Sequence, residues 1–147
     1  MNEHLREYKK QSLGRKLGAS SRLFVNRMNR IFREHGYQVT HEQFKIIISL
    51  SKEEGKTQNT LASHLEKDEP SVSRLVDNMI KRNLVKRVPH PTDRRTNLIF
   101  LTEEGAQMQD ALIVLSKKTA KEATAGVDPK DLETCMKVLE KIIENLE

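Results

Sequence analysis

The residues best suited to bind a ligand lie in a short basic segment in the middle of the chain. Residues 70–96 contain seven Lys or Arg and two Asp, within a protein of 147 residues and formal net charge +5. Ser71, Ser73 and Arg74 stand together near the start of this segment. An Arg side chain can donate to O6 and N7 of guanine, and a Ser hydroxyl can bind a base or a phosphate. These residue types favour a polyanionic partner, with ordinary solvated surface as the alternative.

A second group of candidate residues lies in the turn-rich stretch from Pro89 to Arg95. Asp93 is followed by Arg94 and Arg95, and two prolines restrict the backbone. A narrow minor groove of DNA attracts an inserted Arg because its negative potential is enhanced. We expect Asp93 to orient Arg95, since a free carboxylate would be repelled by phosphates. Alone, the stretch is equally consistent with a solvated hairpin tip.

The surrounding pattern predicts a helix-turn-helix followed by a β-hairpin. Thr57 is suited to cap a short helix, Pro70 stands in the first turn of the next, and Asn83 can end it in the left-handed conformation. Residues 84–88 and 97–101 are typical of two strands. The second helix would enter the major groove, and the free N–H groups at Thr57 could hold a phosphate. The remaining candidate contacts, mostly with the DNA backbone, are Asn78, Lys81, Lys86 and Arg87.

Helices are also predicted on both sides of this region. Apolar spacing indicates one over residues 12–35, and Thr40 with Gln43 forms a capping box that opens another, expected to end at Gly55. A third begins at Thr102, and a last one follows the break at residues 126–129. The fold class is therefore mainly α with a small β-hairpin wing.

The stretch LVKRVPHPTDRRTNLIFLTEEG resembles the wing of the multiple-antibiotic-resistance regulator (MarR) family. The chain departs from the usual family pattern in having Asn83 where Gly is common and Glu66 where a small residue is common. The residues that carry the resemblance are Asp93, Arg95, Leu101, Thr102 and Gly105 in the wing, and Gln58, Leu61, Ala62, Ser71, Val72, Ser73, Leu75 and Val76 in the helix-turn-helix.

The resemblance implies a homodimeric winged-helix repressor that binds a pseudo-palindromic operator in double-stranded DNA. Residues 1–147 would form one domain, with a DNA-binding lobe over 40–101 and a helical dimerisation region over 1–36 and 102–147. The recognition helix would span 69–82, and a pocket beside the dimer interface would accept a small apolar or aromatic effector. Candidate pocket residues, for which ordinary core is the favoured alternative, are Phe24, Met28, Phe44, Ile48, Met108 and Leu112.

The dimer is also predicted from the residues themselves. The last helix has a near-heptad apolar stripe and the first long helix has another, more than a small lobe can bury alone. The alternative is that these helices pack against each other within one chain. The residues predicted to form the interface are Leu13, Leu17, Leu132, Leu139, Ile142, Ile143 and Leu146.

A sensor of oxidants or metals with the same fold is an alternative function. Cys135 lies on the apolar stripe of the last helix, which favours a buried small hydrophobe over a reactive thiol. His35, His41 and Glu42 could approach one another, but a full set of metal ligands is not evident. We therefore expect no metal site and no cofactor.

Other classes of protein are less consistent with the sequence. There are no paired carboxylates, nucleophile–base arrangement or Gly-rich loop of the kind an enzyme needs, so no catalytic residues are expected. No apolar run could span a membrane, no secretory signal is evident, and the single Cys fits the cytoplasm. A winged-helix module that binds proteins instead of DNA remains an alternative, although it would be expected to present a less basic face.

Overall fold

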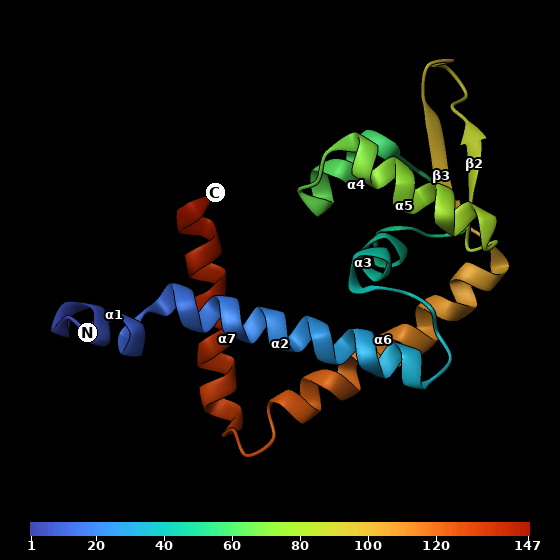
Figure 1. Cartoon of the computed structure of the whole chain (residues 1–147). Coiled ribbons are helices and arrows are strands. Elements are labelled where there is room, and N and C mark those ends of the chain that lie inside the picture. The colour runs from blue at the N-terminus through green and yellow to red at the C-terminus, as the bar shows by residue number, and fades with distance from the viewer.

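The computed structural model describes residues 1–147 and confirms a mainly helical fold with a small antiparallel sheet (Figure 1). Seven helices and three strands follow one another along the chain. Their bounds are α1 Glu3–Gln11, α2 Leu13–Glu34, α3 His41–Ser49, β1 Lys56–Thr57, α4 Gln58–Leu65, α5 Glu69–Lys81, β2 Val85–Pro89, β3 Asn97–Leu101, α6 Glu103–Ala123 and α7 Pro129–Leu146.

The three strands form a sheet in the order β1-β3-β2, in which both pairs are antiparallel. Val85 lies opposite Leu101, and Pro89 lies opposite Asn97, so the hairpin is in register along its whole length. We call residues 40–101, which contain α3, α4, α5 and this sheet, the winged lobe. Residues 1–36 and 102–147 are the helical arm. Figure 1 shows the hairpin projecting from the lobe on the side away from the arm.

Polar caps set the helix starts at the predicted residues. The hydroxyls of Thr40, Thr57 and Thr102 accept hydrogen bonds from the backbone N–H three residues later. In return, the Gln43 side-chain oxygen accepts a hydrogen bond from the Thr40 N–H at 3.2 Å, which completes the predicted capping box. Asn83 has φ +57°, as expected for a residue that ends a helix in the left-handed conformation.

The helix that begins after Thr40 was predicted to run to Gly55, and this was wrong. Helix α3 ends at Ser49, and Leu50 is extended. The Ser51 hydroxyl accepts hydrogen bonds from the N–H groups of Glu53 and Glu54 at 3.2 and 2.9 Å. A side-chain acceptor of this kind offers the backbone an alternative to helical bonds. Neither the short strand β1 nor helix α1 was predicted.

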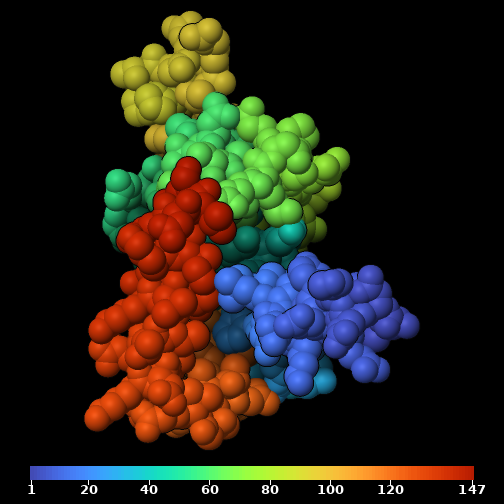
Figure 2. Space-filling view, turned by 90° about the vertical axis from the view of Figure 1, so that its left-hand side faces the viewer, coloured from blue at the N-terminus to red at the C-terminus, as the bar shows by residue number.

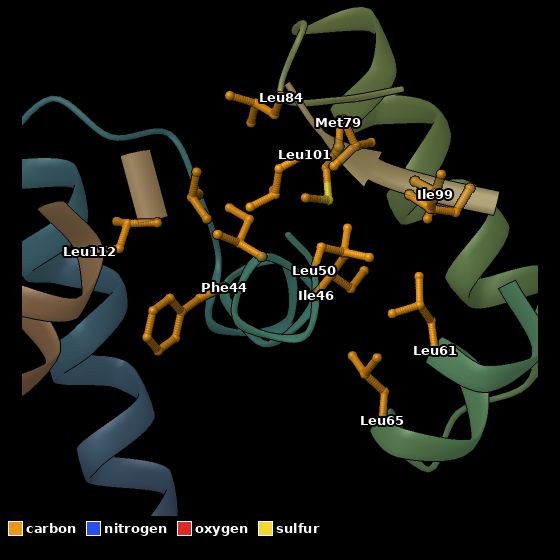
Figure 3. Close-up of a cluster of buried hydrophobic side chains, with 14 of the residues drawn as sticks. Phe44, Ile46, Leu50, Leu61, Leu65, Met79, Leu84, Ile99, Leu101 and Leu112 are labelled. Atoms are coloured by element: carbon orange, nitrogen blue, oxygen red, sulfur yellow. The ribbon is translucent and has the colours of Figure 1, made fainter. Parts of the chain in front are cut away.

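One continuous apolar core joins the winged lobe to the arm, and α3 lies at its centre (Figure 3). Ile46 and Leu50 face the side chains of the lobe, whereas Phe44 points toward Leu112 of α6. The Phe44 ring also meets Phe32 of α2 edge-on, with 5.4 Å between the centroids. Burying α3 on several sides couples the position of the lobe to α2 and α6.

A close backbone contact joins the base of the hairpin to α6. Thr102 connects β3 to α6; its N–H donates to the Leu84 carbonyl at 3.1 Å, and its hydroxyl donates to the Asn83 carbonyl at 2.6 Å. A Cβ atom built on Gly105 would lie only 2.0 Å from that carbonyl oxygen. Glycine is therefore required here so that the first turn of α6 can approach the chain between α5 and β2.

The two ends of the chain expose apolar surface. In the arm α2 packs across α6, but no residue of α1 or α7 is buried. Figure 2 shows α7 along one side of the molecule and α1 projecting on another. None of the helices is both long enough and apolar enough to cross a membrane.

Candidate nucleic-acid interface

The turn between α4 and α5 places the start of α5 at the surface of the winged lobe. Helix α4 ends at Leu65, its C-cap Glu66 has φ +53°, and the Lys67 N–H donates to the Ala62 carbonyl at 3.1 Å. Asp68 then caps α5, so three residues separate the two helices. This tight reversal is the helix-turn-helix that the sequence predicted.

The first turn of α5 holds Arg74 through a short chain of polar contacts. Asp68 accepts from the N–H of Ser71 at 2.9 Å and from its hydroxyl at 2.8 Å. These two bonds, aided by the charge of Arg74, hold the pKa of Asp68 below its usual value. Arg74 in turn donates to the Ser71 oxygen at 3.4 Å. Ser71, predicted to read bases, thus has its proton engaged within the protein and supports the exposed Arg74.

The rest of the outer face of α5 is polar, while Val72, Val76 and Met79 on the inner face are buried. Asn78 accepts a hydrogen bond from the buried Gln43 of α3 at 3.0 Å. Its own amide N–H groups donate to no protein acceptor and can face a phosphate. Ser73 is half-buried, and Lys81 is exposed in the last turn.

The hairpin tip is organised by two side chains that accept from its backbone. His90 Nδ1 accepts from the N–H groups of Thr92 and Asp93 at 3.2 and 3.1 Å. Asp93 Oδ1 accepts from the Arg95 N–H at 3.0 Å and lies 3.6 Å from Arg95 Nε. Asp93 thus contacts both the backbone and the side chain of Arg95, and its role in orienting that side chain stays a prediction. The Arg95 side chain is 93% exposed, so almost no part of the chain covers it.

The cations predicted to contact DNA differ in their partners. Arg74, Lys81, Lys86 and Arg94 form no salt bridge in the chain, and Lys86 lies over the Phe100 ring at 5.9 Å. Arg87 is different, because its Nη2 donates to Asp77 Oδ1 at 2.9 Å and to Gln58 Oε1 at 3.4 Å. Sequence reasoning missed this contact, since only the folded chain brings the three residues together.

The residues predicted for a dimer interface lie in the arm and are poorly covered by their own chain. Leu13, Ile143 and Leu146 are exposed, the last at 83%. Leu17, Leu132, Leu139 and Ile142 are half-buried. Cys135 was expected to be buried, but in the single chain it is exposed on α7.

The six residues predicted for an effector pocket are not brought together around one cavity. Met28, Phe44 and Leu112 are buried in the core, Met108 packs against that core, and Ile48 is exposed. Phe24 alone lines a cavity, of about 420 Å³, which lies between α2 and α6.

The wall of this cavity includes one partly satisfied cation, Arg27. Its Nε donates to Glu122 at 3.0 Å, and its Nη1 lies 3.6 Å from Glu34. Nη1 is buried and has no hydrogen-bond acceptor. The cavity is therefore lined by apolar side chains of both helices and by the charged pair Arg27 and Glu122.

The histidines predicted as metal candidates do not form a metal centre. No group of three or more His, Cys, Asp or Glu side chains is arranged to hold an ion. The backbone N–H of His41 donates to Asn29 Oδ1 at 2.7 Å, and the ring Nδ1 of His35 lies 2.9 Å from the Ile31 carbonyl oxygen. Burial, with a smaller effect of Lys45, lowers the pKa of His41.

A helix-turn-helix followed by a basic hairpin with an exposed Arg defines the winged helix class of DNA-binding proteins. The model of the MarR family matches residues 39–96. An uncharacterised HTH-type transcriptional regulator of Mycobacterium bovis, Mb0904, is 30% identical over 98 residues, covering 65% of this chain and 68% of that protein. The chain belongs to the MarR family, whose members are transcription regulators and not enzymes.

Two further proteins are similar over most of the chain. The transcriptional repressor NicR of Pseudomonas putida is 26% identical over 108 residues, covering 74% of this chain and 68% of NicR. The crystal structure of a mutant MarR from E. coli complexed with operator DNA has a TM-score of 0.81. That similarity covers 92% of this chain and 96% of the other at 24% identity, so it concerns the fold.

Proposed function

We propose that this chain is a homodimeric repressor that binds a pseudo-palindromic operator. The observation that carries the proposal is the presence of two exposed cations, Arg74 on α5 and Arg95 at the hairpin tip, each in contact with a neighbouring polar side chain. Arg74 would read the major groove and Arg95 the adjacent minor groove. Repression is supported by the likeness to NicR.

The remaining contacts would position the protein on the DNA backbone. Lys81, Lys86 and Arg94 have no carboxylate partner in the chain, so each can neutralise a phosphate without breaking a salt bridge. Ser73, Asn78 and the N-terminus of α4 at Thr57 would add neutral hydrogen bonds. As a protein that binds the genome, the chain would act in the cytoplasm.

The dimer is supported by the exposed apolar faces of α2 and α7. A monomer rarely leaves so many large apolar side chains exposed along two helices. A two-fold pair of arms would place the two copies of α5 about 34 Å apart, which is one turn of DNA. We propose that the interface contains Leu13, Leu17, Leu132, Leu139, Ile142, Ile143 and Leu146.

An effector would relieve repression by changing the spacing of the two recognition helices. The cavity between α2 and α6 supports this part of the proposal, because its volume of about 420 Å³ suits a small aromatic ligand. Phe24 would stack on the ligand, and Arg27, whose buried Nη1 lies 3.6 Å from Glu34 without a hydrogen-bond acceptor, would turn to bind its polar group. The other five predicted residues would act as core around it.

The test is selection of bound duplexes from a random DNA pool, followed by affinity measurements at several salt concentrations. A two-fold-symmetric motif with half-sites one turn apart, and a steep salt dependence, would support the proposal. Binding without a motif would instead favour a protein-interaction module or a nonspecific DNA-binding protein. Where one DNA-facing cation is replaced, as in Arg95→Ala, the control is Lys137→Ala, which removes one surface cation from α7, remote from the hairpin.

A further inference from the structure

Arg87 occupies the inner face of the hairpin. In the sheet it lies directly opposite Ile99, and opposite residues of an antiparallel pair share a face. Ile99 is fully buried, and so is Val85, two residues before Arg87. The side chain of Arg87 therefore leaves the strand toward the helices, where the apolar core ends, and not toward the outer surface of the wing.

The guanidinium of Arg87 joins three elements of the winged lobe. It donates to Asp77 in the middle of α5 at 2.9 Å and to Gln58 at the start of α4 at 3.4 Å. The side chains of Arg87 and Asp77 are 32% and 53% exposed. A salt bridge this exposed contributes little to folding stability, so the effect expected of it is on the relative position of the elements that it joins.

Asp77 gives this contact a second purpose. It stands on the outer face of the recognition helix, where an unpaired carboxylate would repel phosphates. Arg87 neutralises it, and to reach a phosphate directly Arg87 would have to release it. Arg94, at the hairpin tip, forms no salt bridge and can bind a phosphate without releasing a partner.

We propose that Arg87 is a positioning residue that fixes the hairpin relative to α5, and that it is not itself a phosphate contact. By holding β2 against the third turn of α5, it sets the distance between Arg95 at the tip and Arg74 on the helix. Discrimination between operator and other DNA then depends on a residue that touches neither groove. This inference rests on the proposed DNA-binding function.

The first test compares Arg87→Gln with Arg94→Gln, using the selected operator and an unrelated duplex. Arg94→Gln should weaken both complexes alike and lower the salt slope by about one, leaving their ratio within about twofold of wild type. Arg87→Gln should lower the ratio of specific to nonspecific affinity, by roughly five- to hundredfold, because a misplaced Arg95 acts like a mismatched base pair. A lost phosphate contact would not change this ratio.

The second test uses Asp77→Ala, for which the two roles predict different ratios of specific to nonspecific affinity. If Arg87 bound phosphate, removing Asp77 would free it to tighten both complexes alike, and the ratio would stay within about twofold of wild type. If Arg87 positions the hairpin, Asp77→Ala should lower the specificity ratio as Arg87→Gln does, and the double variant should lose no more than either single one. Asp110→Ala on α6 makes the same change of charge without touching the lobe and serves as the control.

The outcomes separate this inference from the proposed function. If the wild-type chain selects no operator, the proposed function fails and the inference fails with it. If it selects one, and Arg87→Gln or Asp77→Ala keeps the wild-type ratio of specific to nonspecific affinity, the inference alone is overturned. Thermal unfolding of each variant establishes that the compared proteins are folded.

Discussion

Replacing Gly105 by Ala tests the contact between the hairpin base and α6. In an exposed helix the same change stabilises a protein by about 1 kcal/mol, because Ala loses less backbone freedom on folding. Here the added Cβ would lie 2.0 Å from the Leu84 carbonyl oxygen and 3.2 Å from Leu101 Cδ2. The first of these distances is far inside van der Waals contact, so the backbone has to move.

The loss of stability in Gly105→Ala follows from the hydrogen bonding of the Leu84 carbonyl. The Leu84 carbonyl accepts from the N–H of Thr102 at 3.1 Å, and shifting it lengthens this hydrogen bond, which is worth about 1 kcal/mol. Overpacking adds roughly 1–3 kcal/mol, and the gain in helix propensity offsets about 1 kcal/mol. We expect Gly105→Ala to lower the free energy of unfolding by about 1–3 kcal/mol.

Urea unfolding followed by circular dichroism measures this difference. Gly18→Ala in α2 is the matched control, because a Cβ there meets no atom within 4 Å. It should stabilise the protein by up to about 1 kcal/mol. If Gly105→Ala proved as stable as Gly18→Ala, the close approach of α6 to Leu84 would be refuted.

Three further changes have defined outcomes. Arg95→Ala should cost more than about 1 kcal/mol of operator binding free energy, as expected for one lost groove contact, and an unchanged Kd in a gel-shift titration would remove the wing from the mechanism. A chain ending before Pro129 lacks the apolar face of α7 and should be monomeric or insoluble; a soluble dimer in sedimentation would contradict the proposed interface. His41 has a lowered pKa in the folded chain, caused by burial and then Lys45, so the unfolded chain takes up its proton more readily. Stability should therefore be unaffected by His41 at higher pH and decline as the pH falls below about 6.5, and melting curves of His41→Gln should lose that part of the decline.

The helix starts could be predicted from the sequence because each depends on a local contact. Thr40, Thr57 and Thr102 bond to N–H groups only three residues away, so short-range patterns specify them. The left-handed conformation of Asn83 and the contact between Asp93 and Arg95 are local in the same sense. These predictions needed no knowledge of the tertiary fold.

The features that were missed depend on residues distant in sequence. The α3 helix stops at Ser49 partly because Gln109 of α6 donates to the carbonyls of Ile47 and Leu50. Strand β1 exists because its two residues pair with β3, which lies far along the chain. The link from Arg87 to Gln58 and Asp77 likewise requires the assembled lobe. Apolar spacing alone does not distinguish a core position from a pocket wall, which explains the scatter of the six pocket candidates.

A rotation at the Thr102 junction would displace the far end of the hairpin much more than its base. Strand β3 passes into α6 through this one residue. The pivot of the hairpin therefore lies at the start of α6, and α2 packs across α6 in the arm. A strand of five residues spans about 17 Å, and turning it by roughly 10° moves its far end by about 3 Å. That displacement is close to the spacing of successive bases, about 3.4 Å along one strand. A small rotation in the arm would therefore move Arg95 by about one base step.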